Sequence, residues 1–189
     1  MSVGAQIFRG LRAGWRFLLR DPNAVHLVED SSADVWISFL GPLLALPIYA
    51  LHFALVPHPG EVNVGWFHYI SVFLLGFCLS RLIWPVVITI IGPLHRRQAF
   101  MARYIAAYNW SIPFQMMILF ATVAILSVSA MEPATKAMII ICSYGLVMLY
   151  HSFIVNSVWR IRGRPAFMIA LSEFFIVKFV LGITLLRLG

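Results

Sequence analysis

The sequence predicts an all-α integral membrane protein: a bundle of five transmembrane helices preceded by an amphipathic helix at the membrane surface. The first observation behind this fold class is composition. Of the 189 residues, 61% are hydrophobic and 11% are charged, whereas an ordinary soluble domain is about 25% charged. The second is that apolar stretches of about 20 residues or more, enough to cross roughly 30 Å of hydrocarbon, follow one another with short connections. They leave no room for a soluble catalytic domain.

Basic residues indicate how these stretches are oriented. Ten of the 14 Lys and Arg residues lie in three groups, before the first apolar stretch, after the second and after the fourth: Arg9, Arg12, Arg16 and Arg20; Arg96, Arg97 and Arg103; Arg160, Arg162 and Arg164. Because cytoplasmic loops carry the excess of Lys and Arg, we expect a cytoplasmic N-terminus and a C-terminus on the outer side. The net charge of +7 lies beside the membrane, so its expected partner is anionic lipid and not nucleic acid.

Residues 1–33 are expected to form a cytoplasmic segment with an amphipathic helix over residues 3–20. Apolar residues recur at steps of three and four, and arginines do the same on the opposite side: Ile7, Leu11, Trp15 and Leu18 against Arg9, Arg12, Arg16 and Arg20. Such a helix lies in the headgroup plane with its arginines at the lipid surface. The alternative is a cytosolic helix that packs its apolar stripe on the protein's own loops. Asp21-Pro22 ends the helix, and a polar linker follows.

Residues 34–189 are expected to hold the five spans, at approximately 35–55, 66–93, 106–130, 137–158 and 166–187. Pro42, Pro47, Pro85 and Pro113 fall inside them and predict bent helices, because proline removes a backbone hydrogen bond. Aromatic and histidine side chains at the outer and inner ends of the spans predict anchoring belts at the two membrane surfaces: Trp66, His68 and Tyr69 outside, and Tyr104, Tyr108, Trp110 and Trp159 inside.

Charged side chains within spans are expensive and mark hypotheses for a functional site. At about 1.5 Å per residue, Arg81 and Lys178 lie roughly 18 Å, and Glu173 roughly 10 Å, from the inner ends of their spans. Arg81 can reach Glu173 if the second and fifth spans are neighbours. Glu173 and Lys178 are five residues apart, about 140° around a helix, and so should not pair. His151 lies at the depth of Glu173, and Gln115 adds polarity to the same inner half.

This intramembrane polar cluster has two interpretations. In the first interpretation, the cluster forms a cavity open to the cytoplasm, with Glu173 as an exchangeable acid and His151 and Arg81 as partners in proton or solute movement. Alternatively, its members pair and cross-link the helices, since polar side chains also join helices in membranes. The sequence favours the second interpretation.

The sequence gives no support for an enzyme, a cofactor or a metal site. It lacks the GxxxxGK[ST], GxGxxG, HExxH and GxSxG motifs. Glu173 is the only acid inside a span, which excludes a protease with paired aspartates. Histidines and an acid gather near the first outer loop, but their spacing matches no established ligand motif: His52, His58, His68 and Glu61.

Two segments resemble the Yip1 family of membrane proteins. DVWISFLGPL (34–43) enters the first span, and YIAAYNWSIP (104–113) enters the third, where it is similar to that family's tyrosine and proline motif. The resemblance implies an all-helical membrane fold with a cytosolic N-terminus and five spans. Eukaryotic members are associated with small GTPases and vesicle traffic. The short N-terminal segment here fits a small bacterial inner-membrane protein better.

We therefore expect a non-catalytic, Yip1-like protein that organises membranes or binds partners. Its expected contacts are anionic lipid and, through the faces of Gly41, Gly76 and Gly145 that permit close helix approach, other membrane proteins or copies of itself. No GxxxG motif stands out. One alternative is a small transporter or channel component built on Arg81, Glu173 and Lys178. Another is an accessory subunit of a larger membrane complex. The transporter alternative requires that the three charged side chains face a wet cavity and not a dry helix interface.

Overall fold

The computed structural model describes residues 2–55, 66–94, 98–128 and 130–186, and these residues form helices joined by short connections, without strands. The predicted loop residues His58, Glu61, Arg96 and Arg97 lie outside the described part of the chain. The elements are, in order, α1 (Val3–Leu18), η1 (Pro22–Leu27), α2 (Ser32–Ser38), α3 (Leu40–Leu55), α4 (Trp66–Leu94), η2 (Gln98–Phe100), α5 (Met101–Val128), α6 (Pro133–Trp159) and α7 (Arg164–Leu185).

Five helical stretches among the described residues are long and apolar enough to cross a membrane: Ser32–His52, Phe67–Pro93, Gln98–Val128, Pro133–Trp159 and Arg164–Thr184. The predicted number of apolar helices is therefore confirmed. The third helix begins at Met101, five residues before the predicted span. The helix therefore includes polar residues before the apolar stretch. One of them, Arg103 in the first turn, forms an ion pair of 2.8 Å with Asp30.

The first apolar stretch is bent. Ser31 caps α2 by accepting a hydrogen bond from the backbone N–H of Asp34 (3.1 Å), and the helix breaks at Phe39 before α3 begins at Leu40. Pro42 lies in the first turn of α3, where its missing N–H removes no hydrogen bond. A Cβ atom on Gly41 would lie only 2.3 Å from the carbonyl oxygen of Asn109, so glycine lets α3 approach the backbone of α5.

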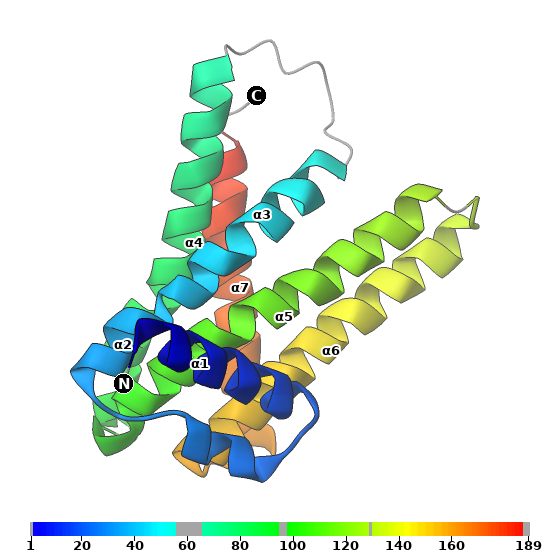
Figure 1. The fold of residues 1–189 in the computed structure, drawn as a ribbon. Helices are drawn as coiled ribbons and strands as arrows, with labels where there is room; N and C mark the ends of the chain where they lie inside the picture. Colours follow the sequence, from blue (N-terminus) through cyan, green and yellow to red (C-terminus); the bar gives the residue numbers. More distant parts are fainter. Residues whose placement is uncertain (1, 56–65, 95–97, 129, 187–189) are drawn as a thin grey trace.

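The five long apolar helical stretches form two groups that meet at one end of the molecule and diverge at the other. In Figure 1, α4 and α7 run upward together, whereas α3, α5 and α6 lean to the right, and contacts are most extensive between α3 and α5, α4 and α7, and α5 and α6. A Cβ on Gly76 would lie 3.1 Å from Thr184 Cγ2, which places Gly76 at the contact of α4 with α7, whereas Gly145 has open space beside it.

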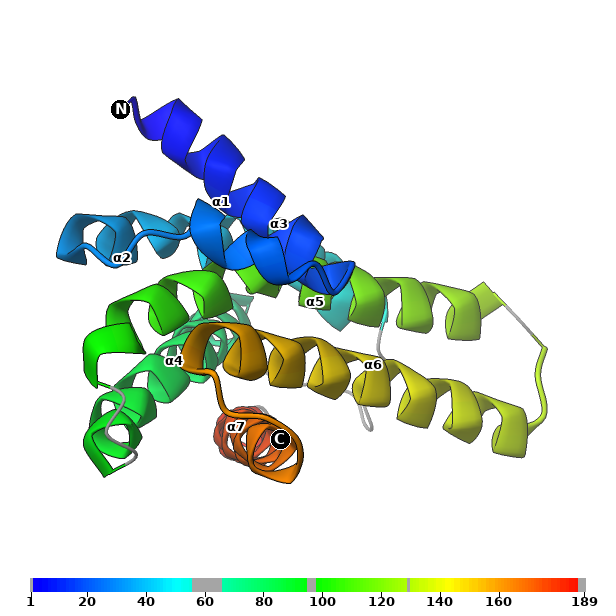
Figure 2. The same cartoon turned by 90° about the horizontal axis from the view of Figure 1, so that it is seen from below.

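The N-terminal helix α1 packs on α5 (Figures 1 and 2). Its buried residues are Gly10, Ala13, Gly14 and Phe17. A Cβ on Gly14 would lie 2.4 Å from the backbone oxygen of Trp110, and one on Gly10 would overlap the Trp110 ring. Gly10 and Gly14 have the GxxxG spacing of closely packed helices. The prediction for this helix used its apolar residues and arginines, and it did not include these two glycines.

The predicted apolar stripe of α1 lies beside this buried face. Ile7, Leu11 and Leu18 are half-buried, and Trp15 is 49% exposed. The stripe therefore meets the protein at one edge and remains open at the other.

Ion pairs hold the N-terminal segment to itself and to the bundle. Arg9 pairs with Glu29 and with Asp34 (3.2 Å), and Arg16 pairs with Asp21. The hydrogen bond from the backbone N–H of Asn23, with the Arg16 guanidinium, holds the pKa of Asp21 below its usual value.

Arg12 and Arg20 differ from their two neighbours. Both are exposed and form no ion pair within the part of the chain that the structure describes. Of the four arginines predicted to meet lipid, Arg9 and Arg16 thus form ion pairs within the protein, and Arg12 and Arg20 remain available to a surface.

Candidate functional site

A buried polar network joins α4, α5, α6 and α7 at the end where the two helix groups meet. The Trp84 indole donates a hydrogen bond to the Tyr104 hydroxyl (2.9 Å), which in turn contacts His151 Nε2. His151 Nδ1 lies 3.4 Å from one carboxylate oxygen of Glu173, and the Tyr108 hydroxyl donates to the other at 2.9 Å. All five residues are buried, with at most 6% of the surface of each exposed.

The network is compatible with a hydrogen bond from the Tyr104 hydroxyl to His151 Nε2, because that hydroxyl accepts from Trp84 and keeps its own hydrogen. In that arrangement the ring N–H lies on Nδ1 and faces Glu173. At 3.4 Å this contact is electrostatic and too long for a strong hydrogen bond.

The predicted inner aromatic belt is wrong, because the four residues assigned to it are buried in the protein. Tyr104, Tyr108 and Trp159 are fully buried and Trp110 is 5% exposed, so they face the bundle and not the lipid headgroups. Trp159 stacks at an angle on Tyr104, with 4.6 Å between ring centroids. Depth in the membrane alone does not distinguish an aromatic side chain that faces lipid from one that faces the protein.

A signal for the network is present in α5. Tyr104, Tyr108, Ser111 and Gln115 are separated by four, three and four residues, which places them on one helix face. All four are buried. The Gln115 amide donates to Ser111 Oγ (2.8 Å), and Ser111 Oγ donates to the Tyr108 carbonyl oxygen (2.6 Å), so the stripe forms one continuous polar face.

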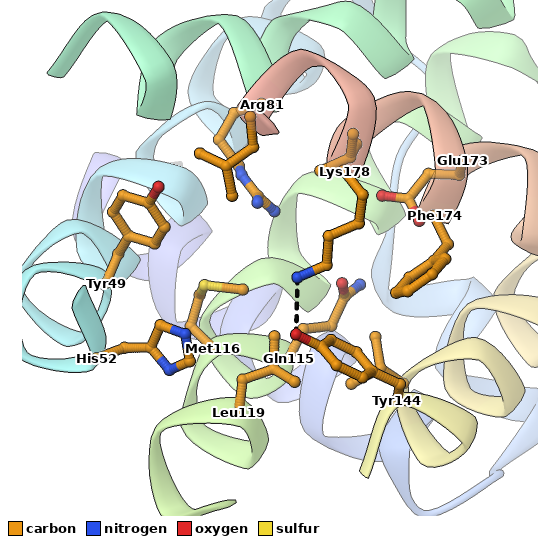
Figure 3. A pocket seen from close by; sticks show the side chains of 13 residues that line it. Tyr49, His52, Arg81, Gln115, Met116, Leu119, Tyr144, Glu173, Phe174 and Lys178 are labelled. Atoms are coloured by element: carbon orange, nitrogen blue, oxygen red, sulfur yellow. Dashed lines mark hydrogen bonds between the residues drawn. The ribbon is translucent and has the colours of Figure 1, made fainter. Parts of the chain in front are cut away.

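Four of the five residues of the predicted polar cluster line one cavity of about 60 Å³: Arg81, Gln115, Glu173 and Lys178. Figure 3 shows Arg81 and Lys178 directed into this space, with the Glu173 carboxylate at its side. A water molecule needs about 10 to 15 Å³ of such space, so the cavity has room for roughly four. His151 lies behind Glu173 and completes the cluster.

Arg81 does not form the expected ion pair with Glu173. The helices that carry them, α4 and α7, are neighbours as the expectation requires, but the Glu173 oxygens face Tyr108 and His151. The Arg81 residue is 6% exposed. Among the described residues its hydrogen bonding is limited to a contact from Nε to Ser80 Oγ at 3.3 Å.

Lys178 is held by aromatic side chains. Its ammonium group donates to the Tyr144 hydroxyl at 2.8 Å and lies 4.4 Å from the centroid of the Tyr144 ring and 5.8 Å from that of Phe174. Lys178 and Glu173 form no ion pair within the described residues, in agreement with their separation along α7. Tyr144 is thus a site residue that the search for charged side chains did not find.

A second, larger cavity of about 370 Å³ adjoins the first. Both are lined by His52, Leu119 and Tyr144, so these side chains form the boundary between them. The larger cavity lies among α3, α5 and α6, and Lys136, in the first turn of α6, forms part of its wall.

Within the described ranges, no group of three His, Cys, Asp or Glu side chains is arranged to hold a metal ion. Two of the four residues near the predicted first outer loop, His58 and Glu61, lie outside these ranges.

No family model, curated protein or solved structure matches the chain. The fold and site define a class: a helical protein with five helices able to cross a membrane, and charged side chains facing a cavity among them. The resemblance to the Yip1 family stays a prediction based on residues 34–43 and 104–113. These segments contact each other, because Gly41 lies against Asn109 and the Asn109 amide donates to Ser38 Oγ at 2.8 Å.

Proposed function

We propose that this protein is a small, non-catalytic membrane transporter or channel component, in which a charged solute or a proton passes through a cavity among the spans. The observation that carries the proposal is that Arg81, Glu173 and Lys178 line the same cavity. We place the N-terminus in the cytoplasm, the C-terminus outside, and the protein in a bacterial inner membrane. The three groups of arginines support the orientation.

The arrangement of charges favours this role over cross-linking alone. Side chains that only join helices in a membrane satisfy each other across a dry interface. Here Arg81 and Lys178 have no carboxylate partner within the described residues, and both face a space large enough for water. Arg81 is also buried, and an ionic group that is buried without a partner costs several kcal/mol, so a wet cavity or a bound solute accounts for this cation better than packing does.

Glu173 supplies the acid that such a passage needs. Its carboxylate lies on the cavity wall and also contacts His151, which leads through Tyr104 to Trp84. A proton taken up by Glu173 would therefore remain within reach of the cavity. In membrane proteins, chains of acidic and histidine side chains of this kind carry protons.

Access to the cavity can be tested with thiols. Cys78 and Cys142, both exposed, are first replaced by alanine. In that background Val177→Cys, on the cavity wall, should react with a charged, membrane-impermeant thiol reagent. Phe175→Cys, on the outward face of α7 and 61% exposed, should not react in the bilayer. A Val177→Cys thiol that fails to react, like that of Phe175→Cys, would contradict a wet cavity.

Flux provides the second test. In proteoliposomes under an imposed pH gradient and membrane potential, wild-type protein should pass ions, and Glu173→Gln should reduce the flux at least tenfold with assembly intact. The glutamine keeps hydrogen-bonding groups for Tyr108 and His151. Glu132→Gln removes an exposed acid before α6 and should leave flux unchanged. Loss of folded protein in Glu173→Gln, with no wild-type flux, would assign the cluster to structure.

A second role is favoured by a different surface. Arg12 and Arg20 are exposed, and so are the apolar side chains of Phe8 (71%), Trp15 (49%) and Leu19 (62%) on the same N-terminal segment. Basic and apolar side chains together bind anionic membrane surfaces. This supports α1 as an amphipathic interfacial helix, and with it the membrane-organising or partner-binding role that the Yip1 resemblance implies.

This role predicts slower hydrogen exchange of the α1 amides in nanodiscs that contain anionic lipid than in purely zwitterionic ones. The double variant Arg12→Gln/Arg20→Gln should remove the difference. An identical exchange rate in both lipids would exclude lipid binding by this surface.

A further inference from the structure

We propose that the cavity between Arg81 and Lys178 is a binding site for a small monovalent inorganic anion, such as a halide or nitrate. This inference rests on the proposed function, because it names the class of solute that the cavity accepts.

The Arg81 guanidinium is the first argument. The residue is 6% exposed and is directed into the cavity (Figure 3). A guanidinium has five N–H donors, and here Nε alone has an acceptor in the described part of the chain, Ser80 Oγ at 3.3 Å. The terminal nitrogens therefore present unused donors to the cavity, and an unpaired charge at a buried residue is costly.

The charges around the cavity are the second argument. The titratable side chains on its wall are Tyr49 and His52 from α3, Arg81 from α4, Tyr144 from α6, and Glu173 and Lys178 from α7; α5 contributes the neutral Gln115. Two basic side chains thus face one carboxylate. That carboxylate is already held by Tyr108 and His151, so the space between Arg81 and Lys178 is positively charged and rich in donors.

Tyr144 adds a further donor. Its hydroxyl oxygen accepts from Lys178 at 2.8 Å, which leaves the phenolic hydrogen free to donate. Lys178 has three N–H donors, and Tyr144 uses one of them. Arg81, Lys178 and Tyr144, from α4, α7 and α6, thus present hydrogen-bond donors to the same cavity.

Size selects the kind of anion. The cavity of about 60 Å³ holds roughly four waters, which is enough for a dehydrated halide or a small oxyanion with one or two waters. A lipid headgroup or an organic phosphate needs more room. The adjoining cavity of about 370 Å³, with Lys136 on its wall, gives such an ion an approach from the α5–α6 end.

The experiment uses full-length protein in zwitterionic nanodiscs. Its thermal unfolding midpoint is measured in sodium chloride, bromide or nitrate against sodium gluconate at constant ionic strength. A ligand that binds only the folded state stabilises it in proportion to RT ln(1 + [L]/Kd). The midpoint should rise with chloride, bromide and nitrate concentration and stay flat in gluconate, whose anion is too large. An equal response to gluconate would overturn the site.

Variants assign the binding to this cavity. Arg81→Met and Lys178→Met should each weaken the apparent affinity at least tenfold, and Arg81→Lys should retain part of it. Arg164→Gln removes an exposed positive charge at the start of α7 and should respond to chloride as wild type does. An unchanged chloride response in Arg81→Met would place the anion elsewhere.

Wild-type protein alone gives an independent measurement, in case the variants do not fold. The ⁸¹Br NMR line of bromide should broaden in the presence of the protein and narrow again when nitrate is added. No broadening beyond that of empty nanodiscs would exclude the site. Anion binding without flux would disprove the transport proposal and leave the site intact, whereas flux without anion binding would disprove this inference and leave the transport proposal intact.

Discussion

The two halves of α5 have different surroundings. Every residue from Tyr104 to Pro113 is buried, whereas from Met117 to Val128 only Thr122 is buried. The first half lies under α1, α2 and α3 and carries the polar network, and the second half borders the 370 Å³ cavity where the helix groups diverge. One helix therefore fixes the fold at one end and borders open space at the other, so equivalent substitutions should have unequal costs.

The largest effect is expected from breaking the network at His151. In His151→Leu, Glu173 and the Tyr104 hydroxyl each lose a partner, both within the buried half. Removal of one member of a buried polar pair costs about 3 kcal/mol or more. The free energy of unfolding, measured by reversible SDS denaturation in bicelles, should fall by that amount. A loss below about 1 kcal/mol would mean that the network contributes little to the fold.

An intermediate effect is expected from two matched glycine substitutions. Gly14→Ala would place a Cβ 2.4 Å from the Trp110 carbonyl oxygen, and overpacking of this kind costs about 1 to 3 kcal/mol. Gly145→Ala in α6 meets nothing within 4 Å and should be neutral or stabilising by up to about 1 kcal/mol, because alanine favours the helix.

The same unfolding measurement checks this pair. Equal destabilisation by both substitutions would show that α1 is not packed on α5 as closely as the structure describes.

The smallest effect is expected in the outer half of α5. Thr122 Oγ1 donates to Ser143 Oγ at 2.7 Å, between α5 and α6. Hydrogen bonds between membrane helices contribute about 0.6 kcal/mol on average, so Thr122→Val should lower the free energy of unfolding by about that much. If Thr122→Val lowered the free energy of unfolding by about as much as His151→Leu, the two halves of α5 would not differ in their contribution to stability.

The number of apolar helices could be predicted from the sequence, because a span needs about 20 apolar residues whatever its neighbours are. The cluster residues could be predicted for a similar reason, since charges in hydrocarbon are rare. Their partners depend on which helices are adjacent. Glu173 contacts His151 and Tyr108 instead of Arg81, and no spacing within one helix contains that information.

The tyrosines illustrate a different limit. Tyr104 and Tyr108 lie where interfacial aromatic residues are expected, but they face Trp84, His151 and Glu173 on α4, α6 and α7. The polar stripe from Tyr104 to Gln115 is the sequence signal for this arrangement. The GxxxG spacing of Gly10 and Gly14 is a separate signal, for the packing of α1 on α5 at Trp110.

The docking of α1 on α5 imposes a delay on the newly made chain. Met101, where α5 begins, follows the end of α1 at Leu18 by about 80 residues, which take roughly 4 to 16 s to synthesise at about 5 to 20 residues per second. For that interval the face of Gly10 and Gly14 has no partner helix. The helix α1 is thus made before α2, α3 and α4 but reaches its place on α5 only after them.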